Sequence, residues 1–296
     1  MKKNALSVFS FLFCSIAAYS QTAYTVVVGM DEIDEKAYKI KYERTYDSDG
    51  TAYVWKDILA IKRIISPLGH QITELRGKQA TQAAILQAIT DIGKKIKPGE
   101  QFTLYYAGHG DLVPDKTGDE ASGFDQVLVA YDDFVVDDKI DMLLNRYFTK
   151  TQNIMIVDAC HSGSSYKMKD FLVIDFKMSS GKKQLYINEK KALKQTEKLS
   201  TCIFDEIIDE PYSLVYLGAT PDGKLSIGNG NGGLLTYCMD NIYRRAIEKE
   251  TWKQYTFRRL ACELMEEMGK SKQHLEYHEV GKNVTLYSAK QPFKLK

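Results

Sequence analysis

The sequence has almost no excess of charge of either sign. Its 296 residues include 40 lysines and arginines against 39 aspartates and glutamates, which gives a formal net charge of +1. Proteins that bind nucleic acid, or that adhere to membranes through a basic patch, usually carry a clear positive excess. The charge balance therefore argues against nucleic acid as the main partner and against a polybasic membrane anchor.

Repeats, low-complexity segments and closely paired cysteines are also missing. No segment recurs at the periods typical of solenoid proteins. The five cysteines form no Cys-x-x-Cys pair, so a structural zinc site has little support. Five cysteines in a chain of this length do not make the disulfide framework of a small secreted scaffold. The composition, 44% hydrophobic and 27% charged, is that of a globular chain that buries a substantial core.

One apolar run, residues 5–18, follows two lysines at the N-terminus. Its length is typical of the core of a signal peptide and is too short to span a membrane. The small residues Ala18 and Ser20 fit a signal-peptidase cut before Gln21. The sequence therefore predicts a signal peptide at 1–20 and an exported protein, periplasmic or extracellular, with no membrane attachment after cleavage. The alternative is a buried N-terminal helix.

Strands and helices are expected to alternate along the chain. Short β-branched or aromatic runs predict strands, and apolar residues at helical spacing, ended by glycine or proline, predict helices. The expected strands are 24–28, 71–75, 101–107, 153–157, 211–218 and 283–288, and the expected helices are 52–65, 81–96, 137–147, 234–249 and 252–268. This alternation predicts an α/β fold with a mostly parallel central sheet and helices on both faces.

Two of the expected strands end in reactive side chains. The strand 101–107 is followed by Gly-His109-Gly, and the strand 153–157 is followed by Asp158-Ala-Cys160. Ligand sites in parallel sheets lie beyond the carboxyl ends of the strands, so His109 and Cys160 face each other if these strands are neighbours. A nearby imidazole lowers the pKa of a thiol or takes its proton. We therefore predict His109 and Cys160 as catalytic residues.

The glycines beside the histidine add a second expectation. Gly108 and Gly110 permit a sharp turn, and the backbone amides of Gly110 and Cys160 are candidate donors to an oxyanion. The alternative for an isolated cysteine is a small buried hydrophobic residue. His161 adjoins Cys160, but consecutive side chains point in different directions, so we expect it to be a structural donor at the start of a helix.

The chain resembles caspase-like peptidases, in particular the metacaspase and bacterial caspase-homologue branch, in two segments: YYAGHGD at 105–111 and DACHSG at 158–163. The number of residues between His109 and Cys160 in the sequence agrees with the roughly 50 seen in caspases. The resemblance extends through 80–89 and 122–144 and weakens after Ser165.

This resemblance implies a caspase-like three-layer sandwich and a cysteine-type endopeptidase with a dyad of His109 and Cys160. It also implies the division of one peptidase domain, 21–296, into a large-subunit-like part, a linker and a small-subunit-like part, at about 21–166, 167–198 and 199–296. The linker is rich in lysine. It is either a site of self-cleavage or a flexible charged loop.

Two aspartates are candidates for substrate binding. Asp158 stands two residues before the nucleophile, as in metacaspases, and Asp57 falls where metacaspases carry a second acidic pocket residue. Only the aspartate of their Asn-Asp-Ala tripeptide is present, and the alternative for Asp57 is a solvated helix residue. Two carboxylates in a narrow pocket favour a guanidinium. The expected partners are therefore peptides or proteins cut after Arg or Lys, and the oligomeric state is not predicted.

The acidic stretch 111–141 raises the question of a metal. Hard oxygen ligands suit calcium, metacaspases often use it, and Asp137 and Asp138 resemble their paired aspartates. These two residues are candidate calcium ligands, with a solvated acidic loop as the alternative. The peptidase chemistry itself needs no cofactor.

Two other functional classes stay open. A catalytically silent caspase-fold binding protein would keep the fold without turnover. A metal centre would use the aspartate, cysteine and histidines of the two strand ends, although adjacent Cys and His cannot easily ligate one ion in tetrahedral geometry. The other histidines are expected to be solvated: His70, His274 and His278.

Overall fold

The computed structural model describes residues 21–46, 51, 53–117, 123–160, 206–207, 210–220 and 226–294. The predicted signal peptide, the lysine-rich linker and His161 lie outside the described residues.

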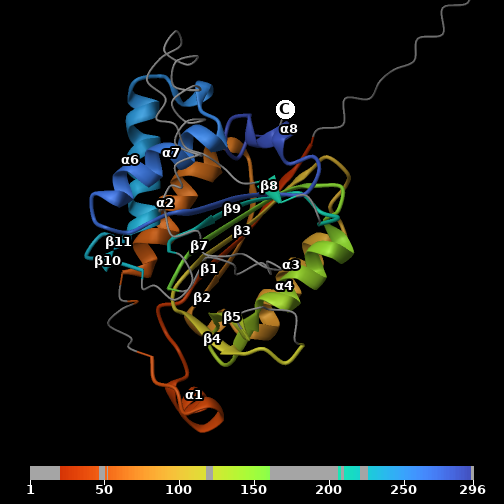
Figure 1. Ribbon diagram of the computed structural model, residues 1–296, viewed down its shortest axis with the longest axis vertical. Coiled ribbons are helices and arrows are strands. Elements are labelled where there is room, and N and C mark those ends of the chain that lie inside the picture. The colour runs from red at the N-terminus through yellow and green to blue at the C-terminus, as the bar shows by residue number, and fades with distance from the viewer. Residues whose placement is uncertain are drawn as a thin grey trace, which may run out of the picture.

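A central sheet of seven strands organises the described part of the chain, in the order β2-β1-β3-β7-β9-β12-β8 (Figure 1). Its strands are β1 Ala23–Gly29, β2 Gln71–Arg76, β3 Gln101–Ala107, β7 Gln152–Asp158, β8 Glu206–Ile207, β9 Leu214–Gly218 and β12 Glu276–Val280. The first five strands of the order are parallel, and β12 runs antiparallel to β9. The predicted mostly parallel α/β sheet is confirmed, and β3 and β7 are neighbours.

Helices cover both faces of this sheet (Figure 1). One face carries α2 Val54–Ile65, α6 Leu234–Glu248 and α7 Phe257–Gly269, and the other carries α3 Gln82–Gly93 and α4 Asp137–Tyr147. Shorter elements are α1 Glu35–Tyr42, α8 Thr285–Ser288 and the 3-10 turns Ser66–Leu68, Gly77–Gln79 and Trp252–Gln254. None of the helices among the described residues combines the length and the apolar character needed to cross a bilayer.

Two small antiparallel sheets extend from the ends of central strands. One consists of β4 Gly110–Pro114, β5 Phe124–Val129 and β6 Phe134–Val136, and the other pairs β10 Gly228–Asn229 with β11 Gly232–Gly233. Only Gly108 and His109 separate the end of β3 from the start of β4, so His109 lies in the short connection between two sheets. The β10–β11 hairpin follows β9 in the chain and ends directly at α6.

Alternate residues of the central strands face the two helical layers. Val27 belongs to the apolar cluster under α2, α6 and α7, whereas Val26 and Val28 belong to the cluster under α3 and α4. Both β1 and β3 are buried along their whole length. Burial on both faces explains why these strands read as continuous apolar runs, and each such side chain contributes about 1.5–3 kcal/mol.

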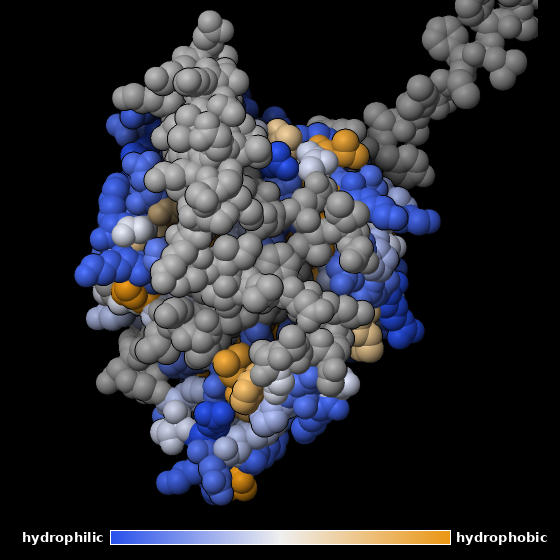
Figure 2. Space-filling view, viewed as in Figure 1, coloured by the Kyte–Doolittle hydropathy of each residue, from blue (hydrophilic) through white to orange (hydrophobic). Residues whose placement is uncertain are grey.

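On the face shown in Figure 2, the described residues are mostly hydrophilic and the apolar ones are scattered. Isolated apolar side chains of this kind are normal on a folded protein.

The last expected strand was wrong. Residues 283–288 contain helix α8 instead. The last strand of the sheet along the chain is β12, which ends at Val280, before the expected segment begins. The sequence EYHEV of β12 reads as polar because of its two glutamates. Glu279 is nevertheless fully buried, since Arg258 donates two hydrogen bonds of 2.6 Å to its carboxylate and Tyr277 donates a third. A paired charge thus stands at a buried position where the alternating pattern of a strand predicts an apolar side chain.

Two expectations for solvated histidines were also wrong. His70 is buried between the Thr25 hydroxyl and the Phe293 carbonyl, at 2.8 and 2.7 Å, and His278 is buried against the ring of Tyr216. Burial lowers the pKa of His70. His274 is exposed as expected.

The expected helix 252–268 is divided into a 3-10 turn and α7. Thr256 caps α7, because its side chain accepts a hydrogen bond of 3.1 Å from the Arg259 amide. A residue with extended backbone at a cap interrupts the helical path. The expected helix 137–147 agrees with α4 at both ends.

Candidate active site

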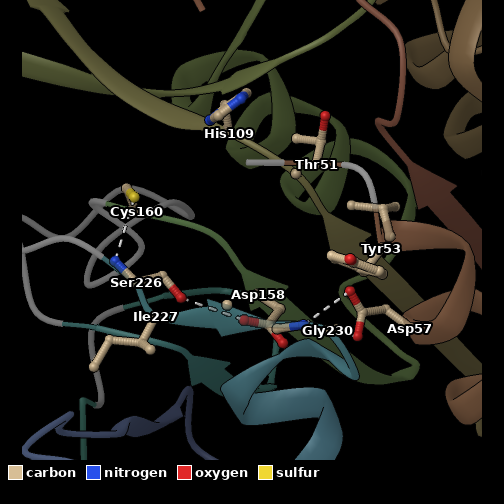
Figure 3. Close-up of a pocket in the computed structure, with 14 residues that line it drawn as sticks. Thr51, Tyr53, Asp57, His109, Asp158, Cys160, Ser226, Ile227 and Gly230 are labelled. Atoms are coloured by element: carbon tan, nitrogen blue, oxygen red, sulfur yellow. Dashed lines mark hydrogen bonds between the residues drawn. The ribbon is translucent and has the colours of Figure 1, made fainter. Parts of the chain in front are cut away.

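A pocket of about 330 Å³ lies where β3 and β7 end. It is lined by all four side chains that the sequence singled out for catalysis and substrate binding: His109, Cys160, Asp57 and Asp158. Figure 3 shows His109 and Cys160 in one part of the pocket and the two aspartates in another. His109 and Cys160 form one end of the site, and Asp57 and Asp158 form the other.

The backbone at His109 is held by two hydrogen bonds. The Tyr106 hydroxyl and the Val129 amide donate to the His109 carbonyl, at 2.6 and 3.0 Å. The imidazole packs against the ring of Tyr46, with a centroid separation of 5.5 Å. Tyr46 is itself fixed, because its hydroxyl donates to the Asp111 carboxylate. These contacts place the imidazole at the wall of the pocket.

The glycines beside His109 are required by space as well as by the bend between the two sheets. A Cβ atom on Gly108 would lie 2.7 Å from the Cβ of Met30, and one on Gly110 would overlap the carbonyl of Cys160. Gly108 and Gly110 are therefore needed for close packing as well as for the expected turn. Their missing side chains let the histidine segment approach the cysteine segment.

The amide of Gly110 is oriented away from β5. His109 accepts from Val129, and Gly110 stands opposite Leu128 in the antiparallel ladder. In such a ladder, hydrogen-bonded and non-hydrogen-bonded pairs alternate, so Gly110 occupies a non-hydrogen-bonded position. Its N–H therefore takes no part in the β4–β5 ladder, which is compatible with the donor role that the sequence predicted.

The Cys160 thiol is partly exposed and follows β7 after Ala159. The Ser226 amide donates to its sulfur at 3.2 Å, as Figure 3 shows. Burial raises the pKa of the Cys160 thiol, and the charges of Asp158 and Asp111 add to the increase, whereas the Ser226 amide opposes it. The thiol of the empty pocket is therefore protonated at neutral pH and needs a base to become a nucleophile.

The two aspartates form a buried acidic pair. Asp57 is 2% exposed and Asp158 is 5% exposed. Burial raises the pKa of Asp57 to about 8, and the negative charge of Asp158 adds to this shift. Burial also raises the pKa of Asp158. The alternative reading of Asp57 as a solvated helix residue is wrong.

Backbone amides at the start of α6 partly compensate the acidic pair. The Gly233 amide donates to the Asp57 carboxylate at 3.0 Å, and the Thr236 amide donates to Asp158 at 2.8 Å. Unpaired amides in the first turn of a helix, together with the helix dipole, favour negative charge. The acidic pair therefore sits on the N-terminal end of α6.

Glycine is essential in the hairpin that precedes α6. Gly232 has φ = 114°, a conformation that side chains rarely adopt, and a Cβ there would overlap the Asp57 carboxylate. A Cβ on Gly233 would overlap Asp158. Only a segment without side chains can lie this close to both carboxylates.

Several lining residues were missed by sequence reasoning: Thr51, Tyr53, Ser226, Ile227 and the glycines of the β10–β11 hairpin. The Gly/Asn-rich stretch 228–233 was recognisable as a loop. Its position after β9, a strand next to β7, is the signal that could have placed it at the same edge of the sheet.

Asp137 and Asp138, the candidate calcium ligands, do not line this pocket. Asp137 is buried, and burial raises its pKa to about 8, with a further contribution from Asp125. A cation would relieve this charge. However, the described residues contain no group of three or more His, Cys, Asp or Glu side chains arranged to hold a metal ion. Asp137 and Asp138 do not by themselves fit a calcium site, and other acidic residues of the stretch lie outside the described residues.

The cysteines fall into two kinds. Cys160 and Cys238 are free, and Cys238 is buried under α6, where burial raises its thiol pKa to about 11. Cys262 on α7 is disulfide-bonded, and its partner lies outside the described residues. A disulfide is typical of an oxidising compartment.

The fold and the pocket together define a caspase-like α/β protein with a cysteine and a histidine at neighbouring strand ends. Caspase-1 from Spodoptera frugiperda has this fold, with a TM-score of 0.53 and 10% identity over 88% of this chain and 89% of that one. Protein GSU0716 from Geobacter sulfurreducens is similar at a TM-score of 0.64 and 20% identity, over 93% of this chain and 99% of that one. The predicted caspase-like fold is confirmed.

Within the caspase-like proteins, sequence comparison finds similarity to metacaspases. Residues 59–169, a little over a third of the chain, match the family described as metacaspase, peptidase C14 domain. Metacaspase-1A of Aspergillus terreus is 36% identical over 92 residues, which are 29% of this chain and 23% of that protein. Metacaspase-1 of Coccidioides immitis is 35% identical, over 29% and 20% respectively. The predicted resemblance to metacaspases is confirmed, and the matched segment spans less than a quarter of these relatives.

The buried acidic pair makes the stability of the fold depend on pH. In the folded chain Asp57 keeps its proton up to about pH 8, whereas in the unfolded chain it ionises near the ordinary aspartate pKa of 3.8. Stability is therefore lost as the pH rises between these values. We expect Asp57→Asn to raise the free energy of unfolding more at pH 9 than at pH 5, with a difference of about 1–3 kcal/mol.

Chemical denaturation in the Cys160→Ala background measures this difference without self-cleavage. Asp91→Asn, which changes an exposed aspartate of α3, is the matched control and should show no such pH dependence. Equal stabilisation by Asp57→Asn at both pH values would contradict the burial of an ionisable pair.

Proposed function

We propose that this chain is an exported cysteine endopeptidase that hydrolyses peptide bonds after Arg or Lys. The observation that carries the proposal is one pocket with Cys160 and His109 in one part and the buried pair of Asp57 and Asp158 in the other. The metacaspase match supports the class of chemistry. It includes His109, Asp158 and Cys160, whereas Asp57 precedes its first residue.

The reaction follows from the protonation of the thiol. The His109 imidazole takes the proton of Cys160, and the thiolate attacks the carbonyl carbon of the scissile bond. A C–S bond forms, and the resulting oxyanion is held by the amides of Gly110 and Cys160. The C–N bond then breaks as the imidazolium gives its proton to the leaving amine. Water, deprotonated by His109, hydrolyses the thioester and restores the thiol.

The acidic pair supplies the specificity in this proposal. A substrate guanidinium entering the pocket meets two buried carboxylates with backbone donors on their far side. It can satisfy them through a forked set of hydrogen bonds, whereas the point charge of a lysine fits less well. An aspartate at the same place would add a third like charge.

Export is proposed on two grounds. The N-terminal sequence has the pattern of a signal peptide, and Cys262 forms a disulfide. Calcium is a separate proposal, because the chemistry above uses no metal. It needs ligands besides Asp137 and Asp138, because these two residues do not by themselves fit a calcium site.

Loss of either member of the dyad tests the proposed chemistry. We expect Cys160→Ala and His109→Ala each to lower kcat for a fluorogenic Arg peptide by roughly 10³-fold or more. His274→Ala changes an exposed histidine and should leave turnover unchanged. Thermal unfolding of all variants checks that the fold is intact. Retained turnover in folded Cys160→Ala would show that another group is the nucleophile, and no turnover in the unchanged chain would favour a catalytically silent binding protein.

Specificity is tested by peptides that differ only in the residue before the scissile bond. We expect Arg peptides to be cut fastest, Lys peptides more slowly and Asp peptides not at all. Asp57→Asn should lower kcat/KM for the Arg peptide by about 10- to 100-fold, since a charge-assisted hydrogen bond contributes about 1.5–3 kcal/mol. It should have much less effect on alkylation of Cys160 by iodoacetamide.

Binding to the Cys160→Ala protein adds a pH test. A cation prefers the ionised pair, so an Arg peptide should bind more tightly at pH 9 than at pH 6.5, as the pH passes the Asp57 pKa of about 8. Efficient cleavage after Asp, or weaker Arg-peptide binding at the higher pH, would overturn the assignment of the pocket.

Self-cleavage is the remaining prediction of the proposed function. The lysine-rich linker 167–198 offers basic residues between the two parts of the domain. Purified protein that starts at Gln21 should separate into two fragments on standing, as seen by reducing gel electrophoresis and mass spectrometry. The Cys160→Ala protein should stay intact, and cutting of that variant in the absence of another peptidase would refute self-processing.

A further inference from the structure

Gln273 is a buried polar residue outside the pocket's lining. Its side chain is 3% exposed and makes three contacts. The side-chain amide nitrogen donates to the Ala219 carbonyl at 2.8 Å and lies 3.5 Å from the Ser226 hydroxyl. The side-chain oxygen accepts from the Ile227 amide at 2.7 Å. One amide group therefore joins the end of β9 to the segment 226–227.

The end of α7 directs Gln273 into this position. The helix ends at Gly269, and the Met268 carbonyl accepts hydrogen bonds from the amides of Ser271 and Gln273. Lys272 has φ = 60°, in the left-handed region. This turn reverses the chain and points it toward β12, with Gln273 on the inner side and His274 exposed.

The segment that Gln273 holds is the one that contacts the thiol. The Ser226 amide donates to the Cys160 sulfur at 3.2 Å, and the Ser226 hydroxyl lies 3.5 Å from Asp158 (Figure 3). The next residue, Ile227, lines the pocket and accepts from the Leu234 amide at the start of α6. The Ser226 amide thus donates to the nucleophile, and the next amide, that of Ile227, donates to Gln273.

We propose that Gln273 is a positioning residue for the nucleophile: by fixing the segment 226–227 to β9, it keeps the Ser226 amide against the Cys160 sulfur. The inference rests on the proposed function, in which Cys160 is the nucleophile. An N–H donor favours the thiolate over the thiol. The other groups that bear on the sulfur are the carboxylates of Asp158 and Asp111 and the imidazole of His109.

The test is the pH profile of Cys160 alkylation by iodoacetamide on the chain from Gln21 to the end, with the modified cysteine assigned by peptide mass mapping. Gln273→Met keeps the length of the side chain and removes both its donor and its acceptor. We expect alkylation at pH 7 to be about tenfold slower, with the midpoint of the profile at a higher pH than in the unchanged chain, since a hydrogen bond to a charged group is lost. For Arg peptides, kcat/KM should fall in parallel.

A second variant and a control keep the test decisive. Gln273→Leu removes the same donor and acceptor and adds no charge, so its alkylation should be slowed as in Gln273→Met. It also serves if Gln273→Met does not fold. His274→Ala, at the exposed neighbouring position, should match the unchanged chain.

An unchanged alkylation profile in a folded Gln273 variant would overturn the inference, even if that variant turned over peptide more slowly. Alkylation does not depend on peptide hydrolysis. If the unchanged chain cuts no peptide, the proposed function fails, and the profiles still decide the role of Gln273.

Discussion

The burial of two carboxyl groups beside each other is the constraint on which this site depends. Asp57 comes from α2 and Asp158 from the end of β7, and both are almost fully removed from solvent. Such a pair is costly unless donors compensate it. The amides of Gly233 and Thr236 do so at the start of α6, and they can approach only because the preceding hairpin ends in two glycines. The acidic pair therefore dictates the hairpin, the start of α6 and its packing against α2.

The same stretch of chain connects the acidic pair to the reactive sulfur. Ser226 contacts Cys160 at one end of the stretch, and Thr236 contacts Asp158 at the other. A change in the position of the hairpin would thus alter both recognition and reactivity. Gln273, which follows α7, restrains this stretch by joining it to Ala219 at the end of β9.

The sequence predicted those features that depend on local pattern. The buried strands β1, β3 and β7 were recognisable as apolar runs. His109 and Cys160 were expected to meet if the strands before them were neighbours, and β3 and β7 are neighbours. Residues whose role depends on a distant partner were not predictable in this way. The strand β12 was missed because its buried Glu279 looks polar in the sequence, although Arg258 pairs its charge. His70 is buried because Thr25 and Phe293 satisfy both ring nitrogens. Gln273 carries no local signal at all, since its three partners come from β9 and the segment before β10.

The electrostatics of the pocket also link recognition to catalysis. The charge of Asp158 is one cause of the raised pKa of the Cys160 thiol. A guanidinium bound between the aspartates would neutralise this charge, so a basic substrate removes part of what keeps the thiol protonated. An acidic substrate would instead add to the negative charge and hold the proton more firmly. In the proposed peptidase the choice of substrate would therefore appear in the chemical step as well as in binding, because the pocket that selects a cation also controls the ionisation of its nucleophile.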